Sequence, residues 1–135
     1  MNKESLLARQ MAAMGQLGYV FLDAIERAHN GGADEKFVEE ARALLTQLSG
    51  KPGDGAIECI KNAKSDLRST ETFLTKWKNH KNDGRFAEVL GIIERVLEIL
   101  QDFNKTLESM SFSEKLAVKL SARLGRAAKR MTQWP

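Results

Sequence analysis

GRFAEVLGIIERVLEILQDFNKTLES, residues 84–109, is the stretch that decides the fold. Its apolar residues recur at steps of three and four, as on one face of an α-helix, and do not alternate as in a strand. One edge of this face holds Phe86, Leu90, Ile93, Leu97, Leu100 and Leu107, and the other holds Val89, Val96, Ile99 and Phe103. Together they cover about half of the helix circumference. Such a helix packs against neighbours on two sides, so we predict that it is the central helix of an all-α protein.

Three glycine-containing breaks divide the rest of the chain: HNGGAD (29–34), SGKPGD (49–54) and NHKNDG (79–84). Gly with Asn or Asp is typical of the end of one helix and the cap of the next. A weaker break, SMSFS (109–113), contains Ser111, which forms the Ser-x-x-Glu pattern of a capping box with Glu114. Helices are therefore expected at about 3–29, 34–49, 55–79, 84–109 and 112–133. Short loops favour antiparallel neighbours, so the expected fold is a single up-down helical bundle of four to five helices spanning 1–135.

Each of the first three helices has its own expected core face. For helix 3–29 it comprises Leu6, Leu7, Met11, Met14, Leu17, Phe21, Ile25 and Ala28. Helix 34–49, with Asp34 as its N-cap, should bury Phe37, Ala41, Leu44, Leu45 and Leu48. For helix 55–79 the expected stripe is Ile60, Ala63, Leu67, Thr70, Leu74 and Trp77.

Composition indicates an intracellular globular protein. The 135 residues are 42% hydrophobic and 29% charged, which is ordinary for one folded domain. No apolar run approaches the roughly 20 residues needed to cross a bilayer. The single cysteine, Cys59, excludes an intramolecular disulfide and fits a reducing compartment, so a cytoplasmic location is expected.

No arrangement typical of an enzyme is found in the sequence. His29 and His80 each fall in the last turn of an expected helix, where a partly positive imidazole suits the negative end of the helix dipole. Neither belongs to a metal-binding pattern, and Cys59 is expected to be a small, half-buried core residue. We therefore predict a protein that is not an enzyme and that has no catalytic residues, metal or cofactor.

A basic cluster surrounds the third break: Lys76, Lys78, Lys81 and Arg85, with Trp77 among them. Basic residues around an aromatic ring are able to hold single-stranded nucleic acid through phosphate contacts and base stacking. However, Trp77 continues the apolar stripe of its helix, and lysines near a helix C-terminus complement its dipole. We interpret this second basic cluster as a core tryptophan with surrounding surface charge, and keep it as a secondary candidate surface.

The strongest candidate surface is the C-terminal stretch. Residues 1–114 contain all 18 acidic residues against 15 basic ones, whereas residues 115–135 contain six basic residues and no acid. On a helical wheel these six fall within an arc of about 120°, which we call the basic arc: Lys115, Lys119, Arg123, Arg126, Lys129 and Arg130. The adjoining arc of about 80° is the apolar stripe: Leu116, Leu120, Leu124, Ala127, Met131 and Trp134.

Such segregation predicts a binding module, an adaptor or small subunit that contacts an acidic protein partner through the basic arc. Two other targets stay open: nucleic acid bound without sequence preference, and an anionic membrane surface. A purely structural helix, whose charges balance the acidic body, is the competing interpretation. The wide apolar faces of helices 3–29 and 84–109 also permit self-association.

Overall fold

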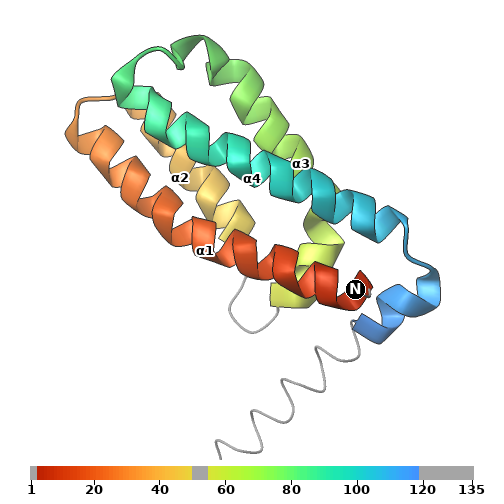
Figure 1. Ribbon diagram of the computed structural model, residues 1–135. Coiled ribbons are helices and arrows are strands. Elements are labelled where there is room, and N and C mark those ends of the chain that lie inside the picture. The colour runs from red at the N-terminus through yellow and green to blue at the C-terminus, as the bar shows by residue number, and fades with distance from the viewer. Residues whose placement is uncertain (1–2, 50–54, 119–135) are drawn as a thin grey trace, which may run out of the picture.

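The computed structural model describes residues 3–49 and 55–118. Its helices are α1 (Lys3–Asn30), α2 (Glu35–Ser49), α3 (Gly55–Trp77), the short 3₁₀ helix η1 (Lys78–His80) and α4 (Gly84–Glu108). Residues 112–118 form a further helical stretch after α4. The chain is thus an all-α, up-down helical bundle, as predicted. α4 packs against both α1 and α3, as its broad apolar face predicts, but α1, α2 and α3 also have two neighbours each, so no single helix is central (Figure 1).

Local chemistry explains where the helices begin and end. Asp34 caps α2, its Oδ1 accepting hydrogen bonds from the backbone N–H of Lys36 (2.8 Å) and Phe37 (3.3 Å). Asp83 caps α4 in the same way, through the backbone N–H of Arg85 (2.9 Å). These contacts satisfy backbone donors that have no partner inside the helix.

The turn after α1 needs a glycine. The N–H of Ala33 donates to the Ala28 carbonyl (3.0 Å), and that of Gly32 donates to the His29 carbonyl (3.1 Å). This pair of bonds is a Schellman motif, which places Gly32 at φ = 83°, a conformation that other residues rarely adopt.

Two apolar clusters fill the bundle. The larger one, formed by all four long helices, centres on the fully buried Phe37. The ring centroid of Phe37 lies 4.7 Å from that of Phe86, 5.1 Å from that of Trp77 and 5.6 Å from that of Phe73. The smaller cluster lies toward the α1 N-terminus and consists of Leu7, Ala63, Phe103, Leu107 and Met110.

The buried face of α3 corrects the predicted stripe. Leu67 and Leu74 are only half-buried, whereas Asp66 and Phe73 are buried. The face therefore follows Ala63, Asp66, Thr70, Phe73 and Trp77, which also has helical spacing. It includes an aspartate because Gln47 of α2 donates a hydrogen bond from Nε2 to Asp66 Oδ1 (3.0 Å). The α-helix also ends earlier than predicted, at Trp77, where it tightens into η1.

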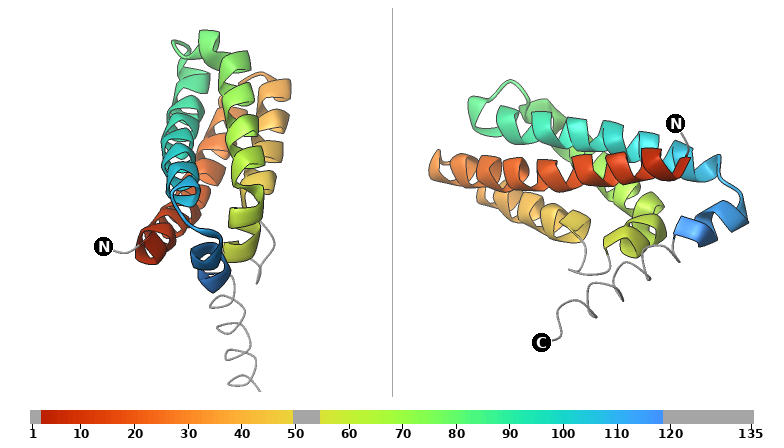
Figure 2. Two further views of the ribbon diagram at one scale, coloured as in Figure 1. Left: turned by 90° about the vertical axis from the view of Figure 1, so that its right-hand side faces the viewer. Right: turned by 60° about the horizontal axis from the view of Figure 1, so that its bottom comes forward.

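Because α2 is shorter than α1, it packs along only part of α1. α1 has 28 residues and α2 has 15, and α2 lies beside the C-terminal half of α1 (Figure 1, Figure 2). Leu6, predicted to be in the core, is 39% exposed near the start of α1. Tyr19 and Leu22 are exposed as well. The predicted core face of α1 is thus fully buried mainly in its C-terminal half, from Phe21 to Ala28.

Candidate binding surfaces

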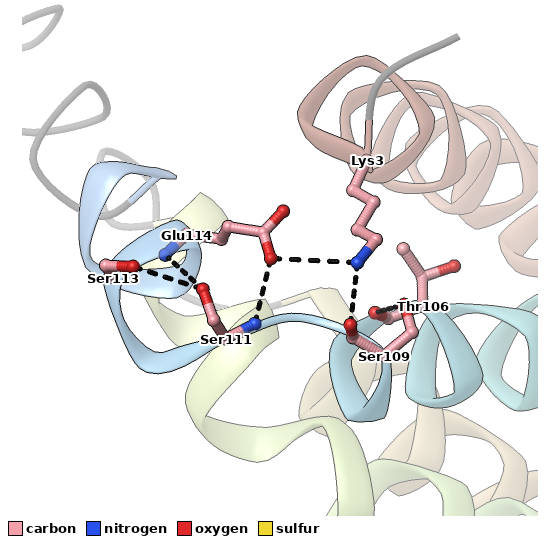
Figure 3. Close-up of polar contacts among 6 residues, drawn as sticks. All are labelled: Lys3, Thr106, Ser109, Ser111, Ser113 and Glu114. Atoms are coloured by element: carbon pink, nitrogen blue, oxygen red, sulfur yellow. Dashed lines mark hydrogen bonds and ion pairs between the residues drawn. The ribbon is translucent and has the colours of Figure 1, made fainter.

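The helical stretch that carries the first residue of the basic arc starts with a complete capping box (Figure 3). The backbone N–H of Ser111 donates to Glu114 Oε1 (3.0 Å), and that of Glu114 donates to Ser111 Oγ (3.2 Å). The backbone N–H of Lys115 then bonds to the Ser111 carbonyl (3.1 Å). The predicted capping box is confirmed, and it fixes the start of this stretch at Ser111.

The capping box is tied to the N-terminus of α1. Lys3 Nζ donates to the Ser109 carbonyl (2.7 Å) and lies 3.6 Å from Glu114 Oε1 (Figure 3). The pKa of Glu114 is held below its usual value, first by the backbone N–H of Ser111, with Lys3 contributing. The carboxylate is therefore charged at neutral pH and joins the first turn of α1 to the start of the last helical stretch.

The stretch then turns one side toward the bundle. Val118 packs against the smaller core cluster, and Lys115 is half-buried. Phe112 and Leu116 are exposed, at 82% and 44%. The other five residues of the basic arc, Lys119, Arg123, Arg126, Lys129 and Arg130, lie outside the described residues.

The second basic cluster is held by acids of the bundle itself. Lys76 forms an ion pair with Glu40 of α2 and lies 5.4 Å from the centroid of the Trp77 ring. Trp77 is 7% exposed, and its Nε1 donates to Glu40 Oε2 (2.7 Å). The pKa of Glu40 is lowered, mainly by the hydrogen bond from Lys76. Because its ring is buried, Trp77 is not available to stack on a nucleic-acid base.

The rest of this cluster is similarly engaged. Lys81 pairs with Glu94 of α4 (2.7 Å), and Arg85 pairs with Asp83 (2.8 Å). The Arg85 side chain and backbone N–H lower the pKa of Asp83 to about 2. Lys78 is exposed and makes no ion pair with the described residues. Three of the four basic residues in this cluster are thus neutralised locally.

An apolar groove is the surface that sequence reasoning missed. It has a volume of about 670 Å³ and runs along α1 from Met11 to Leu22, past Gly15 and Gly18. Leu45 and Leu48 from the end of α2, Cys59 from α3 and Val96 from α4 complete its lining. An adjoining hollow of about 20 Å³ shares Met11, Met14, Leu48 and Cys59 with the groove, and Asp66 also lines it. The pKa of Asp66 is raised by its burial.

Within residues 3–49 and 55–118, the groove lies where α2 no longer runs beside α1. Gly15 and Gly18 have open space where a Cβ would stand, and α2 ends near this level of α1. The mismatch is one of length, since α1 has 28 residues and α2 has 15. The position of α2 along α1, which makes the gap, depends on contacts between distant residues and leaves no local pattern.

The remaining candidates occupy the positions expected from sequence. His29 is exposed in the last turn of α1, and the ring of His80 in η1 lies 4.8 Å from that of Phe86. Cys59 is half-buried beside the smaller core cluster. Within residues 3–49 and 55–118, no three His, Cys, Asp or Glu side chains gather as a metal site. In the same part of the chain, no helix is long and apolar enough to cross a membrane.

Comparison with known proteins adds no relative: no family model matches the chain, and neither the curated proteins nor the solved structures provide a match.

Proposed function

We propose that the chain is a non-enzymatic binding module, an adaptor or small subunit, that contacts an acidic protein through the basic arc. The supporting observation is where charge is already matched. In the described part of the bundle, seven ion pairs join basic to acidic side chains, and they include Lys76, Lys81 and Arg85. Residues 115–135 have six basic side chains and no acid of their own. An acidic partner would supply groups complementary to these six side chains.

The capping box supports a defined surface in place of a loose basic tail. Ser111 and Glu114 start a helical stretch that Lys3 and Val118 attach to the bundle. If the helix continues at 1.5 Å per residue, residues 115–130 extend over roughly 24 Å. The basic arc then presents a row of charges on one side, which suits an acidic surface of matching length.

Binding of three defined probes tests this function: poly-glutamate, a single-stranded oligonucleotide, and vesicles containing phosphatidylserine. We expect the full-length protein to bind poly-glutamate, and the Arg123→Glu/Arg126→Glu/Arg130→Glu variant to bind it at least tenfold more weakly. Preference for the oligonucleotide, with affinity that falls steeply with salt, would replace the protein partner by nucleic acid. Preference for the vesicles would replace it by a membrane surface. Equal binding of every probe by wild type and variant would end the proposal.

A further inference from the structure

We infer that the apolar groove and the exposed side of α1 beside it form a docking surface for a second copy of this chain, which lays its own α1 antiparallel on the first. This inference concerns the bundle and does not rest on the basic arc or on an acidic partner. Three observations on the described residues favour a second copy as the occupant.

The first observation is a continuous uncharged face on α1. Residues 10–22, QMAAMGQLGYVFL, contain no charged side chain. Seven residues fall within an arc of about 120° on the helical wheel, and we call them the α1 face: Ala8, Met11, Ala12, Gly15, Gly18, Tyr19 and Leu22. All are exposed except Met11 and Gly18, which are half-buried. Such a face, about 21 Å long, is typical of a surface that binds another protein.

The second observation is that the α1 face carries both a projection and a recess. Tyr19, which is 79% exposed, projects from it. Gly15 and Gly18 line the groove, and a Cβ on either would meet nothing within 4 Å. In the antiparallel register that sets Tyr19 of each chain opposite Gly15 of the other, Leu22 meets Ala12. A large residue thus meets a small one on both sides of a two-fold axis, which is the self-complementarity of an isologous dimer.

The third observation is the charge beside the α1 face. Arg9 and Asp23 are exposed, and neither forms an ion pair with residues 3–49 or 55–118. They lie about 40° apart on the helical wheel, so they flank the same side of the face. The register described above sets Arg9 opposite residue 25 of the other chain, about 3 Å along the helix from Asp23. A parallel pair would bring like charges together, so charge favours the antiparallel orientation.

One helix therefore supplies both halves of the fit, in shape and in charge. An unrelated partner would have to provide each feature independently. Because stable interfaces bury about 800 Å² on each partner and the α1 face belongs to a single helix, we expect a dimer with a dissociation constant in the micromolar range.

Charge reversal in the full-length protein tests the pairing. Sedimentation velocity from about 1 to 300 μM should show the wild type passing from monomer to dimer. Arg9→Glu and Asp23→Arg should each raise the dissociation constant at least tenfold, because like charges then face each other at both contacts. An equimolar mixture of these two variants should return to within about threefold of the wild type, since opposite charges meet again at both contacts.

Matched controls carry the same charge changes elsewhere. Arg68→Glu and Glu71→Arg alter exposed positions of α3 and should dimerise as the wild type does. A wild type that stays monomeric at every concentration would overturn the inference. So would a mixture of the Arg9 and Asp23 variants that dimerises no better than its components.

The aromatic projection provides a second test. Tyr19→Ala should weaken the dimer at least tenfold. Phe112→Ala removes a ring that is 82% exposed outside α1, and it should leave the dissociation constant within about threefold of the wild type. Circular dichroism checks that each variant keeps its helical bundle. Equal dissociation constants for the Tyr19 variant and the wild type would also overturn the inference.

Discussion

The ammonium of Lys3 lies 3.6 Å from the carboxylate of Glu114, so the first turn of α1 holds the capping box that opens the last helical stretch. The two ends of the described chain therefore meet at one end of the bundle (Figure 2). Val118, the last described residue, packs against the same small core cluster as Met11 and Cys59, which line the apolar groove. Single substitutions can weaken the start of this helical stretch.

Removal of the cap should loosen the start of the last helix. Ser111→Ala removes the hydroxyl that accepts the N–H of Glu114, and the loss of such a cap costs about 1 kcal/mol. Ser113→Ala, whose hydroxyl only contacts Ser111 Oγ at 3.1 Å, should change stability by at most a few tenths of a kcal/mol. Urea unfolding of both variants measures the difference. Equal midpoints would mean that the capping box does not support the fold.

The aromatic cluster should dominate the stability of the bundle. Phe37 is fully buried among Phe73, Trp77 and Phe86, so Phe37→Ala leaves a cavity and should cost about 3–5 kcal/mol. Phe112, which is 82% exposed, is the matched control, and Phe112→Ala should leave the free energy of unfolding within about 0.5 kcal/mol. Thermal or urea unfolding tests both. A large loss from Phe112→Ala would instead reveal that residues outside the described bundle cover that ring.

The sequence predicts the helix bounds more accurately than the buried faces. The ends of α1 to α4 lie within about two residues of their predicted positions, because caps such as Asp34 and Asp83 act through contacts only a few residues apart. The predicted end of the last helix, at 133, lies outside the described residues. α4 is identified by its own broad apolar face. The buried face of α3 is missed because a hydrophobic pattern omits Asp66, whose burial depends on Gln47 from another helix.

Among the candidate surfaces, too, the sequence predicts those that depend on local spacing and misses those that depend on contacts between helices. The basic arc is a property of local spacing, so periodicity alone locates it, although five of its six residues lie outside the described part of the chain. The neutralisation of the second basic cluster could not be predicted, because Glu40 and Glu94 come from other helices. The groove is a consequence of how far α2 reaches along α1.

Asp66 should make the protein less stable at neutral pH than at acid pH. Its pKa is raised by burial, so the folded state holds a proton that the unfolded state releases, and stability falls as pH rises through that interval. Asp66→Asn keeps an acceptor for Gln47 Nε2 without the buried charge. The variant should therefore melt at a higher temperature than the wild type at pH 7 and at nearly the same temperature at pH 3. Asp102→Asn on the exposed face of α4 is the control, with no change expected.

Asp83 should give the opposite pH dependence, with its carboxylate stabilising the protein at neutral pH and not at strongly acid pH. Arg85 lowers its pKa from 3.8 to about 2, so the ionised carboxylate contributes stability above pH 3.8 that is lost as pH falls through about 2. Asp83→Asn keeps the capping acceptor but loses the charge. The variant should be slightly less stable than the wild type at pH 6, and this gap should close near pH 2. Urea midpoints at the two pH values measure it, and a gap that persists at pH 2 would contradict the assigned role.

The central claim is that the position of the basic residues, and not the net charge, makes the binding surface. The most direct measurement compares poly-glutamate affinity of two variants with the same charge change, Arg123→Glu/Arg126→Glu/Arg130→Glu on the basic arc and Lys61→Glu/Lys64→Glu/Lys78→Glu on exposed positions of α3 and η1. The account predicts that the first loses at least tenfold in affinity and that the second stays within about threefold of the wild type. Equal losses in the two variants would contradict it.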